Sequence, residues 1–215
     1  MLRCMKKTLL LIVYGIILNN ICLAQNKYFF GINGGTTYSN LRGNEMLDDN
    51  KYEFGYLIGV SFDYYMKEDL SLKANLNFER KSSSREENFM SESGDDMHPL
   101  KFRLNVDYLL LPVLIKYDFG INNNFYINGG PFIGYQLSSK AKSDDMPTQD
   151  LSGKKLDLGL TLGMGTVFSI NETNDISVEL RDNLGLINTA DRPVMNDGSI
   201  KTNSWSFVVN WRFEI

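Results

Sequence analysis

The stretch "DYLLLPVLIKYDFG", residues 107–120, contains an apolar run from Tyr108 to Ile115 that is interrupted by Pro112 and ends at Lys116. The run is too short for a membrane-spanning helix, which needs about 20 apolar residues. It is also a poor central strand for a soluble sheet, because Pro112 has no N–H group to donate to a neighbouring strand. The environment that suits this stretch therefore depends on the rest of the chain.

The composition favours a single domain rich in β structure. The chain has 215 residues, of which 43% are hydrophobic and 22% are charged, an ordinary balance for one domain. Aromatic residues make up 12%, and 18 glycines accompany only 5 prolines, a composition that leans towards strands. The net charge is −4 and no basic stripe is visible, so we expect no nucleic-acid partner.

The first 24 residues differ from the rest of the chain and have the order of a secretory signal. Basic residues come first, an apolar stretch follows from Leu9 to Leu18, and the segment closes on Cys22, Leu23 and Ala24. We expect cleavage after Ala24, which makes residues 1–24 the signal peptide and residues 25–215 the mature domain. A retained membrane anchor is the alternative, but Asn19 and Asn20 interrupt a run that is already short of about 20 residues.

Cleavage would remove both cysteines of the chain. Cys4 and Cys22 lie in the signal segment, so the mature chain is expected to be exported without a disulfide. A lipoprotein anchored through Cys22 is a weaker alternative, because the bulky Ile21 precedes the cysteine. The signal also carries three basic and no acidic residues, so its removal changes the net charge from −4 to −7.

Apolar and polar residues alternate with a period of two throughout the mature chain, and no segment keeps a helical period. In the run 70–79, for example, apolar residues occupy the even positions and polar residues the odd ones. Eight runs show the pattern: 27–39, 52–66, 70–79, 100–117, 125–137, 156–168, 176–181 and 203–215. Each run is predicted to be a β-strand with one apolar and one polar face.

The fourth run changes its pattern near Pro112. Upstream, apolar residues from Leu100 to Tyr108 occupy even positions, whereas Ile115 and Tyr117 place the apolar face at odd positions. One extra residue in a strand reverses the faces that its side chains occupy. We therefore predict a β-bulge at Pro112, where a proline is tolerable.

Short and long connections alternate along the chain. Short turns are predicted at 67–69, 120–124 and 171–175, and long polar loops at 40–53, 82–99, 139–154 and 188–203. Tight periplasmic turns and long outer loops over an even number of strands are typical of a transmembrane barrel. The predicted fold is thus all-β, an antiparallel up-and-down transmembrane β-barrel. Residues 108–117 then form one membrane-crossing strand, near the required length of about 9–11 residues.

Aromatic residues gather at the two ends of the predicted strands. Those near the short turns are Tyr28, Phe30, Tyr64, Tyr117, Phe119, Phe125, Phe168, Trp211 and Phe213, and those near the long loops are Tyr38, Tyr56, Phe78, Phe102, Tyr135 and Trp205. Two girdles around an aliphatic middle are what the two interfaces of a bilayer select. We therefore expect the apolar faces to point outwards to lipid and the polar faces inwards. Ordinary core aromatics of a soluble barrel are the alternative.

Four segments also resemble those of a known family. They are "LNVDYLLLPVLIKYDF" at 104–119, "FYINGGPFIGY" at 125–135, "LDLGLTLGMGTVF" at 156–168 and "LRDNLGLIN" at 180–188. In this order they are similar to segments of the PorT-like outer-membrane β-barrel proteins of Gram-negative bacteria. The resemblance covers nearly the whole mature chain and implies an eight-stranded barrel with both termini in the periplasm. It implies no defined activity. Such chains often end on an aromatic residue that the insertion machinery reads, whereas here Glu214 and Ile215 follow Phe213.

Two features of the sequence could suggest catalysis, and each has a simpler explanation. "GLTLGMG", residues 159–165, continues as a strand and lacks the helix that a phosphate-binding glycine loop must open. The only histidine, His98, lies near Asp95 and Asp96 in a predicted outer loop. Nothing in the spacing supplies the positioned partner and the nucleophile that a hydrolase needs. We therefore predict that the protein is not an enzyme and needs no cofactor.

Three acidic pairs lie in the predicted outer loops, at Asp48–Asp49, Asp95–Asp96 and Asp144–Asp145. They lack the spacing of a calcium-binding loop, so we expect them to serve solubility and predict no metal site. Binding of divalent cations near lipopolysaccharide head groups is the alternative.

A barrel of eight strands is only wide enough for its own inward side chains. Charged side chains that face this interior are expected to form salt bridges, because unpaired buried charges are costly. The predicted inward network consists of Lys73, Glu79, Arg103, Asp107, Asp157, Glu179, Arg181 and Arg212, with Asp63 and Lys101 as further members. The lumen is therefore predicted to be plugged.

These features together predict an integral outer-membrane protein with a structural or surface-interaction role through its extracellular loops. The expected partners are outer-membrane lipid and lipopolysaccharide, the barrel-insertion machinery and an unidentified loop partner. The alternatives are a soluble exported barrel that binds a lipid-like ligand, a small porin and an outer-membrane hydrolase.

Overall fold

The computed structural model describes residues 27–44, 47, 49–87, 100–121, 124–143, 147–151, 153–191 and 198–215. The predicted signal segment, Asp48, His98 and the pairs Asp95–Asp96 and Asp144–Asp145 lie outside these residues.

Within the described residues the chain forms β-strands joined by turns and loops. The strands are β1 (Tyr28–Arg42), β2 (Lys51–Lys67), β3 (Leu70–Glu87), β4 (Leu100–Phe119), β5 (Phe125–Ser143), β6 (Gln149–Asp150), β7 (Leu156–Ser169), β8 (Asn174–Gly185) and β9 (Lys201–Glu214). Apart from the two-residue β6, they correspond to the eight predicted runs. No helix in the described part of the chain is long and apolar enough to cross a membrane.

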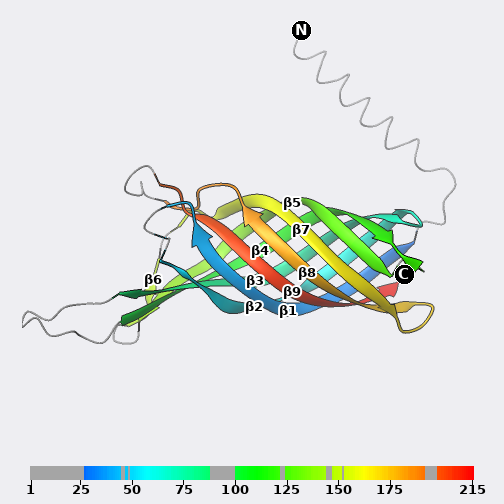
Figure 1. The fold of residues 1–215 in the computed structure, drawn as a ribbon, viewed down its shortest axis with the longest axis horizontal. Coiled ribbons are helices and arrows are strands. Elements are labelled where there is room, and N and C mark those ends of the chain that lie inside the picture. Colours follow the sequence, from blue (N-terminus) through cyan, green and yellow to red (C-terminus); the bar gives the residue numbers. More distant parts are fainter. Residues whose placement is uncertain are drawn as a thin grey trace, which may run out of the picture.

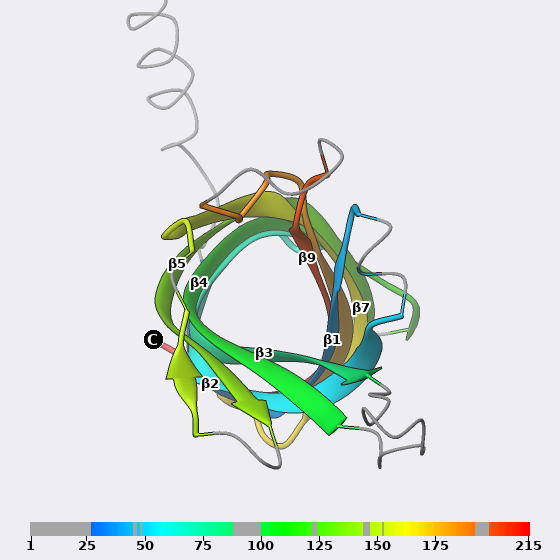
Figure 2. The same ribbon diagram turned by 90° about the vertical axis from the view of Figure 1, so that its left-hand side faces the viewer.

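Neighbouring strands pair antiparallel, and the sheet closes on itself. The strand order is β4-β3-β2-β1-β9-β8-β7-β5-β6, and the additional pairing of β4 with β5 completes the ring. Seen from one end, the strands enclose a lumen (Figure 2). The prediction of an all-β, antiparallel up-and-down barrel is therefore confirmed.

The pairing registers determine how strongly the strands tilt (Figure 1). A path across the sheet at right angles to the strands leaves β1 at Tyr28, passes through Ile115 of β4 and Leu162 of β7, and returns to β1 at Tyr38. The stagger around the barrel is thus the ten residues that separate Tyr28 from Tyr38. For eight strands this stagger corresponds to a tilt of about 40° to the barrel axis.

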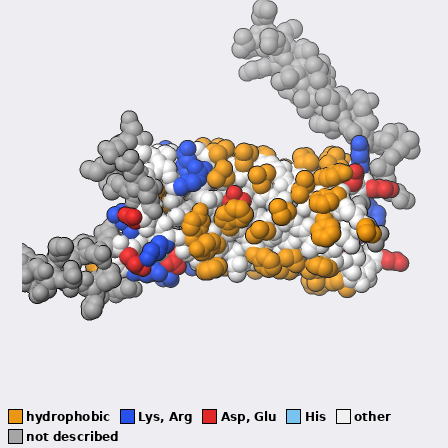
Figure 3. Space-filling view, viewed as in Figure 1, with side chains coloured by type: hydrophobic (Ala, Val, Ile, Leu, Met, Phe, Trp, Pro, Cys, Tyr) orange, Lys and Arg blue, Asp and Glu red, His pale blue; other side chains and the backbone are white. Residues whose placement is uncertain are grey.

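The two faces of the barrel wall have opposite polarity. Outward side chains such as Ile32 and Leu162 are apolar and exposed, the latter by 67%. Many inward side chains, such as Asn33 and Thr161, are polar and buried. Figure 3 shows hydrophobic side chains over the middle of the wall and most of the charged side chains towards its ends. A soluble barrel has the reverse arrangement, so the outer wall requires apolar surroundings.

Aromatic side chains border the apolar band at both ends. At the end with the short turns, Tyr28 stacks on Tyr64 with ring centres 5.3 Å apart. At the other end, Tyr38 stacks on Tyr52 at 4.9 Å. Phe102 lies beyond this outer girdle, because it pairs with residue 85 near the tip of β3.

The orientation of β4 upstream of Pro112 differs from the sequence-based prediction, whereas Ile115 and Tyr117 point outwards as predicted. Even positions face the lumen throughout residues 106–118, so Tyr108 and Leu114 point inwards. The registers of β4 with both neighbours stay in phase on either side of Pro112, and the predicted bulge at the proline is wrong. A register shift lies instead at Asp107/Tyr108, where β5 contributes one extra residue. The prediction fails because both odd and even positions of β4 carry apolar residues, so their alternation does not indicate which face points inwards.

Two prolines interrupt the pairing of β4 with its neighbours. The β3–β4 ladder is interrupted opposite Pro112, and the β4–β5 ladder is interrupted where Val113 faces Pro131. At each interruption a proline without an N–H group stands where a donor would be. The middle of β4 is therefore held by fewer backbone hydrogen bonds than its ends.

Strands β3, β4 and β5 extend beyond the outer girdle. β3 continues to Glu87 and β5 to Ser143, whereas the sequence predicts loops from residues 82 and 139. Figure 1 shows these strands and β6 protruding at the end opposite the short turns. The extensions lack a clear alternation of apolar and polar residues, as in the serines at 82–84, so period-two reasoning does not detect them.

Candidate functional site

The lumen is lined by buried charged side chains of both signs. Within the described residues, five acidic and five basic side chains are buried, namely Asp63, Glu79, Asp118, Asp157, Glu179, Lys73, Lys81, Lys116, Arg181 and Arg212. They come from β2, β3, β4, β7, β8 and β9. The equal numbers leave this set without net charge, which reduces the cost of burying the charges.

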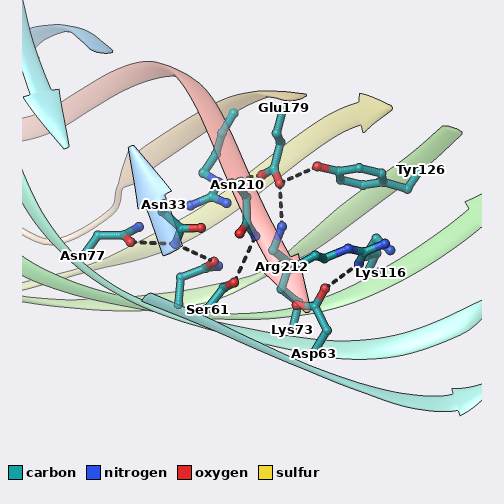
Figure 4. A network of polar contacts seen from close by, with 12 residues as sticks. Asn33, Ser61, Asp63, Lys73, Asn77, Lys116, Tyr126, Glu179, Asn210 and Arg212 are labelled. Carbon is teal, nitrogen blue, oxygen red and sulfur yellow. Dashed lines mark hydrogen bonds and ion pairs between the residues drawn. The ribbon is translucent and has the colours of Figure 1, made fainter. Parts of the chain in front are cut away.

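Glu179 lies at the centre of a cluster inside the barrel. Its carboxylate accepts hydrogen bonds from Lys73 at 2.9 Å, from Arg181 Nε at 2.7 Å and from the Tyr126 hydroxyl at 2.9 Å. Figure 4 shows the side chains of Lys73 and Tyr126 converging on Glu179. Lys73 comes from β3, on the opposite side of the ring from β8, so this ion pair joins two walls of the barrel.

A second cluster lies nearer the short turns. Arg212 contacts Asp63 at 2.8 Å, and Lys116 lies 2.6 Å from Asp118. The hydroxyl of Tyr65 accepts a hydrogen bond from Lys116 at 2.8 Å. Figure 4 shows Asp63, Arg212 and Lys116 beside the Glu179 cluster.

A third cluster lies nearer the end from which β3, β4 and β5 protrude. Asp157 accepts hydrogen bonds from Thr202 at 2.7 Å and from Lys81 at 3.4 Å. Glu79 accepts a hydrogen bond from Ser204 at 3.0 Å. Charged clusters therefore follow one another along the lumen.

The structure brings together most of the residues that the sequence predicts for the inward network. Those in the lumen clusters are Lys73, Glu79, Asp157, Glu179, Arg181 and Arg212. Arg103 is exposed and pairs with Glu53 at 3.0 Å, and Lys101 pairs with the same carboxylate at 2.7 Å. Asp107 points outwards and pairs with Arg80 at 2.6 Å. The inward placement of Arg103, Asp107 and Lys101 is wrong because it rests on the reversed orientation of β4.

Sequence reasoning missed the aromatic side chains inside the lumen. Lys81 Nζ lies 5.0 Å from the ring centre of Tyr108 and 5.3 Å from that of Phe132. Contact with a ring face stabilises a buried ammonium group. The signal that could have found Phe132 is its even position on β5, which it shares with the polar Asn128 and Gln136.

A small cavity lies beside Lys81 in the outer half of the lumen. Its volume is about 10 Å³, and its lining includes Leu104, Val106 and Tyr108. A cavity of this size holds about one water molecule. Apolar side chains of β4 therefore fill the lumen beside the charged Lys81.

Charged side chains also gather outside the barrel, beyond the outer girdle. Burial raises the pKa of Glu53, but the hydrogen bond from Lys101 and the charge of Arg103 outweigh it and hold the pKa below its ordinary value. A hydrogen bond from Lys51 lowers the pKa of Glu86 in the same way. Both carboxylates are thus ionised at neutral pH, and this face of the protruding sheet carries ion pairs.

Within the described ranges, no group of three His, Cys, Asp or Glu side chains could hold a metal ion. Asp49 is described and exposed. His98 and the other members of the predicted acidic pairs lie outside those ranges.

The sequence matches the family described as outer membrane protein beta-barrel domain over residues 23–191, which is more than half of the chain. The chain belongs to this outer-membrane β-barrel family. Among curated proteins, none matches the sequence.

Solved structures similar to the chain include two outer-membrane proteins. Neisserial surface protein A is 13% identical, with 86% of this chain and 97% of that protein covered and a TM-score of 0.48. Outer membrane protein W of E. coli is 15% identical, with 90% and 100% covered and a TM-score of 0.45.

Membership of the outer-membrane β-barrel family places the protein in the outer membrane. The exposed apolar band of the wall then faces lipid, and the two aromatic girdles lie at the membrane interfaces. A soluble barrel with an internal lipid-like ligand does not fit, because it would turn its apolar face inwards.

Proposed function

We propose that this outer-membrane barrel does not conduct, because its own side chains plug the lumen, and that it has a structural or surface-interaction role. The observation that carries the proposal is the charge-balanced set of ten buried side chains in the described part of the lumen. Ion pairs across the lumen, such as Lys73–Glu179, occupy the space that a water-filled channel would need.

The protruding ends of β3, β4 and β5 are the part that we propose for contact with partners. Lys140 and Lys142 are exposed on β5, and Lys142 pairs across the strands with Arg103. The exposed ammonium groups of Lys140 and Lys142 lie beyond the outer girdle and can contact the anionic groups of lipopolysaccharide. A protein partner of the loops is a further part of the proposal, and enzymatic activity is not.

Within the family, we propose the PorT-like group, on the four segments that resemble it. The order of residues 1–24 supports export through a signal cleaved after Ala24. The first strand begins and the last strand ends beside the short turns, where Ile215 N donates to Tyr28 O at 2.9 Å. This arrangement supports termini in the periplasm.

Conductance in a planar lipid bilayer tests the plugged lumen. We expect no stable channel steps from the purified mature protein. The control combines Lys73→Ser, Tyr126→Ser, Glu179→Ser and Arg181→Ser, which removes the central cluster and should produce detectable steps. Heat-modifiable migration on gels checks that this variant folds. Steady conductance from the unmutated protein would refute the proposal and identify a small porin.

A further inference from the structure

A groove runs across the outer wall of the barrel, on the face that meets lipid. Its volume is about 560 Å³, and its lining comes from β4, β5, β7, β8 and β9. The lining includes Ile115, Ile127, Gly129, Leu162, Asp182 and Trp205. The volume lies within the range of small-molecule sites, roughly 300–1,000 Å³.

The groove exists because Gly129 has no side chain. Gly129 has Ile115 and Leu162 as its cross-strand neighbours on the two sides. A Cβ atom at residue 129 would lie 3.0 Å from Leu162 Cδ2, so a larger residue there would fill the hollow. Gly34 on β1 provides a comparison, because it lies on the outward face outside the groove, and a Cβ there would meet no atom within 4 Å.

The groove climbs towards the outer interface of the membrane. Cross-strand pairing leads from Ile115 through Gly129 and Leu162 to Asp182 of β8 and then to Trp205 of β9. Trp205 in turn pairs with Tyr38 of the outer girdle. Because the strands tilt by about 40°, this path rises from the hydrocarbon layer to the level of the outer-leaflet head groups.

Asp182 places a carboxylate on this lipid-facing wall. Its neighbours across the two adjacent strands are Leu162 and Trp205. The side chain is half-buried, and its Oδ1 atom lies against the protein without a hydrogen-bond partner among the described residues, so the other carboxylate oxygen is the one that can be open to lipid. Arg80 and Asp107, which also point outwards, neutralise each other. Asp182 feels the charges of Arg42 and Lys81, and an ionisable group at the edge of the hydrocarbon layer indicates a site where a further polar partner binds.

We propose that the groove binds one acyl chain of an outer-leaflet lipid, and that Asp182 accepts a hydrogen bond from an amide or hydroxyl group near the head-group end of that chain. The aliphatic side chains of Ile115, Ile127 and Leu162 suit the methylene groups. The carboxylate lies near the interface, where the polar donors of a lipid begin. The inference rests on the outer-membrane location and does not depend on whether the lumen conducts.

Fluorescence of Trp205 gives a direct test, because this side chain lines the groove. In a Trp211→Phe background it is the only tryptophan, and brominated lipids quench it on contact. The protein is reconstituted in phosphatidylcholine vesicles with either a brominated ceramide, which carries amide and hydroxyl donors, or the same amount of brominated phosphatidylcholine, which carries none. We expect the ceramide to bind next to Trp205 about fivefold more tightly than phosphatidylcholine and to quench it correspondingly more, because one net hydrogen bond provides about this ratio of affinities.

Three variants locate the preference in the groove. Asp182→Leu should abolish it, and Gly129→Leu should abolish it by filling the hollow, whereas Gly34→Leu should leave it unchanged. Asp182→Asn keeps a weaker, neutral acceptor and should reduce the preference, and it replaces the leucine variant if that does not fold. Equal quenching by the two lipids in the unmutated groove would refute the proposal. Absence of quenching by either lipid would also refute it, since a second copy of the chain would then cover the groove.

Discussion

Glu179 shows how a single buried charge is accommodated inside this barrel. The side chain is 2% exposed, and its carboxylate accepts hydrogen bonds from Lys73, Tyr126 and Arg181. These donors come from β3, β5 and β8. Removal of the carboxylate would leave two basic groups buried without their counter-charge, which costs more than the loss of the contacts themselves.

Glu179→Ala is therefore expected to lower the free energy of unfolding by about 3–5 kcal/mol. Arg103→Ala is the matched control, and it should cost less than about 1 kcal/mol because its ion pair with Glu53 is solvent-exposed. The sequence alone places both residues in the lumen and predicts destabilisation for each. Urea-induced unfolding in lipid vesicles measures the difference, and equal losses would contradict the outward position of Arg103.

Strand β4 shows how one element can be apolar on both faces. Its odd residues, such as Leu111, are exposed to lipid, while Leu110 and Leu114 are 0% exposed inside the lumen. The long apolar run in residues 107–120 thus arises because this strand borders lipid on one side and a largely apolar part of the lumen on the other. The interruptions opposite Pro112 and Pro131 weaken the same segment.

Pro131→Ala should strengthen the pairing of β4 with β5. The alanine N–H can donate to the carbonyl oxygen of Val113, and the added hydrogen bond should slow amide exchange of Val113 about fivefold. The stability of the whole barrel should change little, because loss of the proline ring also frees the unfolded chain. Pro147→Ala, at an exposed residue outside the ladders, is the control. Unchanged exchange at Val113 would contradict this account of the interruption.

The whole molecule has two distinct ends. The beginning of β1 and the end of β9 lie side by side at the end with the short turns, as the hydrogen bond from Ile215 N to Tyr28 O shows. The protruding parts of β3, β4 and β5 lie at the opposite end (Figure 1). In a bacterial outer-membrane barrel the longer loops face the outside of the cell.

An epitope tag inserted near Asp145 should therefore be reachable by antibody on intact cells, whereas a tag near Asn123 should not. β5 ends at Ser143 at the protruding end, whereas β4 ends and β5 begins at the short-turn end. Both tags should be labelled after the outer membrane is permeabilised, which serves as the control. Labelling of intact cells through the Asn123 tag alone would show that the barrel has the reverse orientation.

The sequence by itself determined the class of fold and most of the lumen. On β3 and β8, charged residues such as Lys73 and Glu179 alternate with aliphatic ones, and this alternation is enough to identify the inward face of each strand. The alternation of short and long connections similarly distinguished the two ends of the barrel. Local physics suffices here, because lipid and lumen select opposite side chains at successive positions.

The tertiary structure alone decided the orientation of β4 and the partners of each lumen charge. Where both parities are apolar, as around Leu110 and Leu111, alternation carries no information about which face points inwards, and only the registers with β3 and β5 settle it. The pairing of Lys73 with Glu179 spans 106 residues and depends on the ten-residue stagger that closes the ring. Closure is a property of all the strands together, so no single segment of the sequence specifies which charges meet across the lumen.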